Sequence, residues 1–197
     1  MGKIVSLCTL LLGAQFSLLG VEKLPLKYQI SYGETSAPIK ITEYFSLSCP
    51  KCLKSFQKDF KVVQEKYIKT HQVQWTFHLN PADLLTLQAM LCLEKLSPSE
   101  KSIFFEVLIE NLENLSQGTT LMKITMEALG KPMPHLEDVE DLKKQPLFLI
   151  AFNYLKQPGI VQELPTVEIN GTIYDEYPHL KFIEKKISSL QKIRAAQ

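Results

Sequence analysis

Residues 39–52 read IKITEYFSLSCPKC, and this stretch decides the fold. Its first half, Ile39–Phe45, is rich in β-branched and aromatic residues, which predicts a strand. The pair Cys49 and Cys52 follows closely, and a helical pattern begins there and runs to about Lys69. Apolar residues recur along that helix every three or four positions: Phe56, Phe60, Val63 and Tyr67.

Two cysteines spaced by two residues at the start of a helix favour thiol chemistry. Unpaired N–H groups and the helix dipole stabilise a thiolate at that end, which lowers the pKa of the first thiol. One helical turn brings both sulfurs within bonding distance. Pro50 suits a first turn, where its missing N–H is not needed, and Lys51 adds a positive charge that favours the thiolate. We expect Cys49 to be the attacking nucleophile and Cys52 the resolving thiol.

The cysteine pair has two other interpretations, a metal site and a pair of inert core residues. Tetrahedral zinc needs two further ligands at suitable spacing, and Cys92 and the four histidines form no second paired cluster. We therefore expect no metal and no cofactor. Cys92 lies in an apolar run, 90–93, and is expected to pack as a small hydrophobe, with a regulatory or intermolecular thiol as the alternative.

Glu43 interrupts the apolar face of the predicted strand. Ile39, Ile41 and Phe45 share its face, so the carboxylate is expected to point towards the core. Burial of an unpaired carboxylate is costly and raises its pKa. Beside Cys52, such a group could relay a proton during thiol exchange. The alternative is a residue at the strand end that reaches solvent.

The rest of the chain predicts an α/β domain with a central mixed sheet flanked by helices. Residues 73–79 alternate with period two, as in a strand, and residues 81–158 are helical, starting at Asn80-Pro81. Thr166–Tyr174 contains Asn170-Gly171 and predicts a hairpin. A final amphipathic helix is expected from Pro178 to about Ile193.

The N-terminus differs from the rest of the chain. Residues 1–20 combine one lysine with a leucine-rich run and are typical of a secretory signal peptide, with an uncleaved anchor or a buried helix as alternatives. Residues 21–197 would form one domain with a helical insertion at 81–158. The chain has 197 residues and a net charge of +1, without the basic stripe of a nucleic-acid-binding protein.

These motifs together resemble the DsbA-like branch of the thioredoxin superfamily. The resemblance covers roughly residues 30–190 and includes a helical insertion of the expected length and place. It is carried by three segments: Ala37-Pro38-Ile39 leading into Ile41-Thr42-Glu43-Tyr44-Phe45, then Ser48-Cys49-Pro50-Lys51-Cys52, and Leu164-Pro165-Thr166-Val167 with Asn170-Gly171.

The resemblance implies a thioredoxin fold with an inserted helical domain. It implies that Pro165 is cis and lies against a Cys49–Cys52 redox disulfide, that the backbone of Leu164 binds an extended substrate peptide, and that Glu43 is the family's buried acid. The sequence departs from the strongest oxidants of the family at Lys51, where they carry His, and at Leu164, where many carry Val or Thr. Both positions tune redox poise, so the resemblance does not imply a strongly oxidising potential.

The function expected from this resemblance is thiol–disulfide exchange with cysteines of exported proteins, in the direction of disulfide formation, through the Cys49–Cys52 redox disulfide. The partners would be cysteine-containing exported polypeptides and a membrane redox protein, with no nucleic acid, and the protein would be a monomer of the periplasm or cell envelope. A reductase or isomerase fed by a membrane electron donor is one alternative. A non-catalytic binding or chaperone module is the other.

Overall fold

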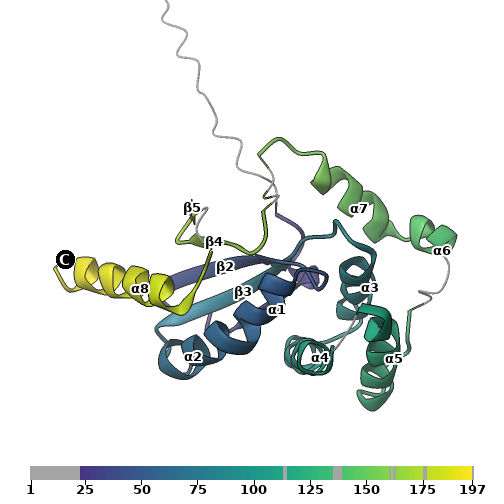
Figure 1. Ribbon diagram of the computed structural model, residues 1–197, viewed down its shortest axis with the longest axis horizontal. Coiled ribbons are helices and arrows are strands. Elements are labelled where there is room, and N and C mark those ends of the chain that lie inside the picture. The colour runs from purple at the N-terminus through teal and green to yellow at the C-terminus, as the bar shows by residue number, and fades with distance from the viewer. Residues whose placement is uncertain are drawn as a thin grey trace, which may run out of the picture.

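The computed structural model describes residues 23–112, 115–134, 139–159, 161, 163–174 and 177–196, and the predicted signal peptide lies outside these residues. A five-stranded mixed sheet forms the centre, in the order β1-β3-β2-β4-β5 (Figure 1). The strands are β1 (Gln29–Tyr32), β2 (Ile39–Phe45), β3 (Val73–Leu79), β4 (Thr166–Ile169) and β5 (Thr172–Tyr174). Among the described helices, none has both the length and the apolar character needed to cross a membrane.

Most helices lie between strands in the sequence, and one follows the last strand. The helix after β2 is α1 (Pro50–Ser55) continued by α2 (Lys61–Val63), with π-helical segments at Phe56–Phe60 and Gln64–Ile68 that the sequence pattern did not predict. Between β3 and β4 lie α3 (Leu84–Leu93), α4 (Pro98–Asn111), α5 (Gly118–Ala128), α6 (Val139–Lys144) and α7 (Pro146–Leu155), and α8 (Leu180–Ala195) follows β5. Short 3-10 turns occupy Leu26–Tyr28 and Leu115–Gln117.

Strand β2 runs through the interior of the sheet. It pairs in parallel with β3, where Glu43 lies opposite Phe77, and antiparallel with β4, where Glu43 lies opposite Val167. Both parallel and antiparallel pairs therefore occur, as the element order predicts. Because β2 has a strand on each side, the Glu43 side chain projects from one face of the sheet and not from an edge.

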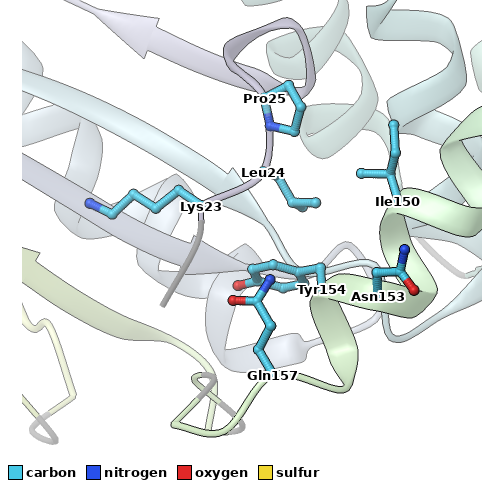
Figure 2. A pocket seen from close by; sticks show the side chains of 7 residues that line it. All are labelled: Lys23, Leu24, Pro25, Ile150, Asn153, Tyr154 and Gln157. Atoms are coloured by element: carbon cyan, nitrogen blue, oxygen red, sulfur yellow. The ribbon is translucent and has the colours of Figure 1, made fainter. Parts of the chain in front are cut away.

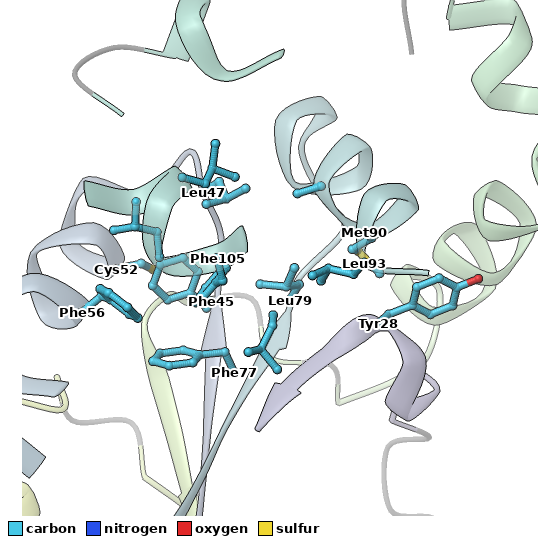
Figure 3. Close-up of a cluster of buried hydrophobic side chains, with 14 of the residues drawn as sticks. Tyr28, Phe45, Leu47, Cys52, Phe56, Phe77, Leu79, Met90, Leu93 and Phe105 are labelled. Carbon is cyan, nitrogen blue, oxygen red and sulfur yellow. The ribbon is translucent and has the colours of Figure 1, made fainter. Parts of the chain in front are cut away.

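The helices cover both faces of this sheet. The helix after β2 and α4 lie below the sheet in Figure 1, and α7 lies above it. Phe105 of α4 packs edge-on or tilted against three aromatic rings, with centroids 5.2–5.5 Å apart: Phe45 and Phe77 of the sheet and Phe56 of the helix after β2 (Figure 3). The helices between β3 and β4 thus share one hydrophobic core with the sheet.

The hairpin and the last helix follow the prediction. Asn170 and Gly171 both have positive φ values, 47° and 85°, as the two-residue turn between antiparallel strands requires. Helix α8 begins after His179, whose Nδ1 accepts a hydrogen bond from the Phe182 N–H. Ser97 and Glu100 form a capping box at the start of α4.

The sequence prediction was wrong at three places. Helix α3 begins at Leu84 rather than at Pro81, because the carboxylate of Asp83 accepts the Thr86 N–H as N-cap. Strand β1 was missed, since its four residues give too short a pattern. His78 falls on the side of β3 that the period-two pattern assigns to polar residues, yet it is fully buried, because the ring of Tyr154 in α7 lies over it with ring centroids 5.3 Å apart.

His78 gives the fold a specific pH dependence. Its Nε2 accepts the Leu24 N–H at 3.1 Å, and burial lowers its pKa from 6.5 to about 4. Between these values the unfolded chain binds more protons than the folded one, so stability falls as pH drops. We expect the wild type to lose about 3 kcal/mol more than His78→Gln between pH 6.5 and 4. Urea unfolding across that range measures the difference, and parallel pH profiles would contradict it.

Candidate active site

Cys49 and Cys52 lie where β2 passes into α1. The turn Ser46–Ser48 links the two elements, and the Cys49 N–H donates to the Ser46 carbonyl at 3.2 Å. Cys49 is the N-cap of α1, and its sulfur accepts the N–H of Cys52 at 3.2 Å. Pro50 occupies the first helical position, as predicted, where no N–H is required.

The surroundings of Cys49 stabilise its thiolate. Its pKa is lowered from 9.0 to about 6, first by a hydrogen bond with the Cys52 thiol and then by the backbone N–H groups of Cys52 and Lys51. The positive charge of Lys51 adds a smaller effect in the same direction, and partial burial opposes the shift. The residue remains partly exposed, so an anionic sulfur here is accessible to a reaction partner.

Cys52 has the opposite character. It is fully buried within the core, next to Phe45 and Phe56 in Figure 3. Burial raises the pKa of its thiol, and the hydrogen bond to Cys49 raises it further, so Cys52 is a neutral thiol at physiological pH. One turn of helix therefore holds an accessible, acidic thiol and a buried, weakly acidic one.

The loop before β4 lies against this pair. The Leu164–Pro165 peptide bond is cis, as the family resemblance implies. The Leu164 carbonyl accepts a hydrogen bond from the Cys49 thiol at a distance of 3.6 Å. Residues 115 positions apart in sequence therefore meet at the nucleophile, which places Leu164, one of the two predicted groove residues, beside it.

Glu43 is buried on the face of β2 that the sequence predicts. Its side chain is fully enclosed, and burial raises its pKa from 4.5 to about 8. The Ser55 hydroxyl and the Trp75 indole N–H lie near enough to lower this pKa in part, but neither meets the carboxyl oxygens in hydrogen-bonding geometry. Glu43 is therefore mostly protonated at neutral pH, with its charge state coupled to the nearby thiols.

Cys92 is separate from this site. It lies fully buried in α3, its sulfur 4.0 Å from that of Met133, and burial raises its pKa to about 12. This agrees with the prediction of a core residue. Within the described part of the chain, no three His, Cys, Asp or Glu side chains gather as a metal site would require.

A pocket of about 240 Å³ lies elsewhere on the molecule, between the segment before β1 and α7 (Figure 2). None of the three cysteines that the structure describes contributes to it. Its lining residues are Lys23, Leu24, Pro25, Ile150, Asn153, Tyr154 and Gln157. This pocket is therefore separate from the cysteine pair.

Two features of the site were not predicted. The Tyr177 hydroxyl donates to the Lys51 carbonyl at 3.3 Å, a contact between distant segments that no local pattern announces. The Asp83 carboxylate accepts hydrogen bonds from the turn before Cys49. The spacing of Asp83 and Thr86 is a helix N-cap signal that would have located the start of α3, although not the contact with the turn.

Comparison with known proteins shows the family of this chain. The family model described as thioredoxin matches residues 26–189, most of the chain. The chain belongs to the thioredoxin family. No curated protein matches this thioredoxin-family chain by sequence.

Solved structures show the same fold, that of DsbA-type proteins. Oxidised BdbD from Bacillus subtilis aligns with a TM-score of 0.68 at 21% identity, over 86% of this chain and 96% of that one. The α-DsbA1 of Wolbachia pipientis gives 0.63 at 24% identity, over 88% and 97%. The DsbA of Chlamydia trachomatis gives 0.54 at 18% identity, over 84% and 91%. The predicted thioredoxin fold with inserted helices is confirmed.

The contrast between the cysteines predicts selective alkylation. Because only the thiolate reacts, iodoacetamide should modify Cys49 in the reduced native protein with a midpoint near pH 6, while Cys52 and Cys92 react only after denaturation. Peptide mapping of samples alkylated between pH 4 and 9 measures this. A midpoint at the value of a free thiol, about 8.5, would contradict the proposed environment.

Proposed function

We propose that this protein is a thiol–disulfide oxidoreductase that acts on cysteines of exported polypeptides through a Cys49–Cys52 redox disulfide. The observation that carries the proposal is the difference between the two thiols. Cys49 is partly exposed with a pKa of about 6, and Cys52 is buried with a raised pKa. A partner can reach the first sulfur, while the second is protected and poised to close the pair.

In the oxidising direction, a substrate thiolate attacks the Cys49 sulfur of the disulfide, and the bond to Cys52 breaks. The Cys52 sulfur leaves with the electron pair and takes up a proton. A second substrate thiolate then attacks the substrate sulfur of the mixed disulfide, and Cys49 leaves as a thiolate. The substrate loses two electrons and the cysteine pair gains them. Because a leaving thiol of low pKa departs faster, the acidity of Cys49 favours release of the product.

Glu43 supports the first of these steps. A buried thiolate at Cys52 is unfavourable, so the departing sulfur needs a proton as it leaves. Glu43 carries one at neutral pH, because its pKa is about 8, and it interacts electrostatically with Cys52. We infer that Glu43 donates this proton in the oxidising direction and accepts it in the reverse one.

The substrate would be an extended peptide held beside the cis-Pro165 loop. The Leu164 carbonyl faces the Cys49 sulfur, so a substrate cysteine bonded to Cys49 lies next to this backbone. Cys49 is partly exposed, so a cysteine of a polypeptide can reach its sulfur. Lys51 and Pro50 are exposed at the same surface.

Disulfide formation is the favoured direction. A Cys49 pKa of about 6 stabilises the dithiol form at pH 7 by at most about 1.4 kcal/mol, or about 30 mV for two electrons. Because Cys49 is partly exposed, water screens part of this effect. The shift raises the reduction potential and so strengthens the disulfide as an oxidant.

Export and a redox partner complete the proposal. The signal-like pattern of residues 1–20 supports a location in the periplasm or cell envelope. A membrane protein would reoxidise the pair, and the enzyme would act as a monomer. In the alternative direction, a membrane electron donor would keep the pair reduced for a reductase or isomerase. A binding or chaperone module would need neither thiol.

The reduction potential measured against glutathione tests the direction. We expect a value between that of thioredoxin, roughly −270 mV, and that of DsbA, roughly −120 mV, because the Cys49 pKa is intermediate. A value near thioredoxin's would favour the reductase instead. Oxidative refolding of a reduced, disulfide-containing substrate tests activity, and Cys49→Ser should abolish it. Equal refolding by wild type and Cys49→Ser would indicate the binding module.

Glu43→Gln should slow the exchange at Cys52 and stabilise the fold. The wild type keeps a proton on Glu43 between pH 4.5 and 8, so its stability falls as pH rises through that range, whereas glutamine does not titrate. We expect the variant to be about 3 kcal/mol more stable at pH 7 and about 10²-fold slower in exchange.

Stopped-flow fluorescence of Trp75, the single tryptophan, measures this exchange rate. The matched control is Glu168→Gln, which removes a carboxylate from β4 of the same sheet; its oxygens bind Lys23 and Tyr44 rather than facing the thiols. The control should exchange at the wild-type rate. An unchanged rate in Glu43→Gln would remove the relay role even if the stability rises.

A further inference from the structure

The turn that carries Cys49 is bound to the first helix after β3 by a carboxylate. Asp83, the N-cap of α3, accepts hydrogen bonds from the Ser46 and Ser48 hydroxyls, each at 2.7 Å. It also accepts the N–H and the hydroxyl of Thr86, at 2.8 and 2.7 Å. One side chain therefore receives four hydrogen bonds, two from each of two segments that are about 35 residues apart.

Backbone contacts extend this connection along the turn. The Leu47 N–H donates to the Thr86 hydroxyl at 2.9 Å, and the Ser48 N–H donates to the Ser46 hydroxyl at 3.0 Å. All three residues before Cys49 are thus tied to Asp83 or Thr86. The hydroxyl hydrogens of Ser46, Ser48 and Thr86 all go to the Asp83 carboxylate. The hydroxyl oxygens of Ser46 and Thr86 also each accept a backbone N–H.

We propose that Asp83 is a positioning residue that holds the Ser46–Ser48 turn so that the Cys49 sulfur stays over the first turn of α1. The proposal rests on the proposed function in taking Cys49 as the nucleophile. The link is direct, since the Cys49 N–H donates to the carbonyl of Ser46, one of the two serines that Asp83 binds. The same carboxylate caps the N-terminus of α3. Asp83 therefore connects α3 to the turn that carries the nucleophile.

Two physical effects of Asp83 on Cys49 have opposite signs, which makes the proposal testable. As a negative charge, Asp83 disfavours the thiolate, so its removal would lower the Cys49 pKa. By holding the turn, Asp83 keeps the Cys49 sulfur near the N–H groups that stabilise the thiolate. Through this effect, removal of Asp83 would raise the Cys49 pKa towards the value of a free thiol. Helix capping alone predicts no change at Cys49.

The experiment follows thiolate absorbance and the iodoacetamide rate of Cys49 against pH in reduced wild type, Asp83→Ala and Asp83→Asn. We expect Asp83→Ala to raise the Cys49 pKa by about one unit, which slows alkylation about tenfold at pH 5. Asparagine is an equally good N-cap but has one acceptor oxygen instead of two, so Asp83→Asn should shift the pKa in the same direction by less. If the alanine variant does not fold, the asparagine variant decides the question.

The matched control is Ser97→Ala, which removes the N-cap of α4 without touching the turn. It should lose stability and keep the wild-type Cys49 titration. An unchanged or lowered Cys49 pKa in the Asp83 variants, or an equal rise in Ser97→Ala, would overturn the positioning role. A wild-type Cys49 that titrates as a free thiol would instead refute the proposed function, so the two failures are distinguishable.

Discussion

The chemistry of this protein depends on the hydrogen bonds that the Cys49 sulfur receives at the start of α1, from the Cys52 thiol and from the Cys52 N–H. They exist because Cys49 ends the turn after β2 and caps α1, which leaves its sulfur facing unpaired N–H groups. Because two residues separate the cysteines, Cys52 lies on the side of α1 that faces the core. A helix start thus creates both the acidic thiol and its buried partner.

The rest of the structure holds that helix start in place. Strand β2 reaches it from the interior of the sheet and is paired on both sides, so its end is well fixed. The helix that follows inserts Phe56 into an aromatic cluster completed by Phe105 of α4. The cis-Pro165 loop approaches from the C-terminal half, and the Asp83 hydrogen bonds approach from α3. Three distant segments therefore converge on one turn.

Two ionisable side chains are buried on the sheet, at a cost in free energy. Glu43 and His78 lie on opposite faces of adjacent strands, and both are fully enclosed. Burial favours their neutral forms, so the pKa of the carboxyl is raised and that of the imidazole lowered. His78 retains one hydrogen bond, from Leu24, whereas the oxygens of Glu43 have none of normal geometry. A buried polar group without compensation is characteristic of functional sites, which is consistent with a proton-transfer role for Glu43.

The sequence by itself determined the elements whose signals are local. The Ile39–Phe45 strand, the cysteine pair at a helix start, the Asn170-Gly171 hairpin and the inward direction of Glu43 all follow from periodicity or turn chemistry within a few residues. Only the tertiary structure decided the contacts between distant segments. The burial of His78 depends on Tyr154, the neighbours of Cys49 include Leu164, and the turn before it depends on Asp83. Such contacts are set by how the helices pack on the sheet, and no local pattern encodes which side chains that packing brings together.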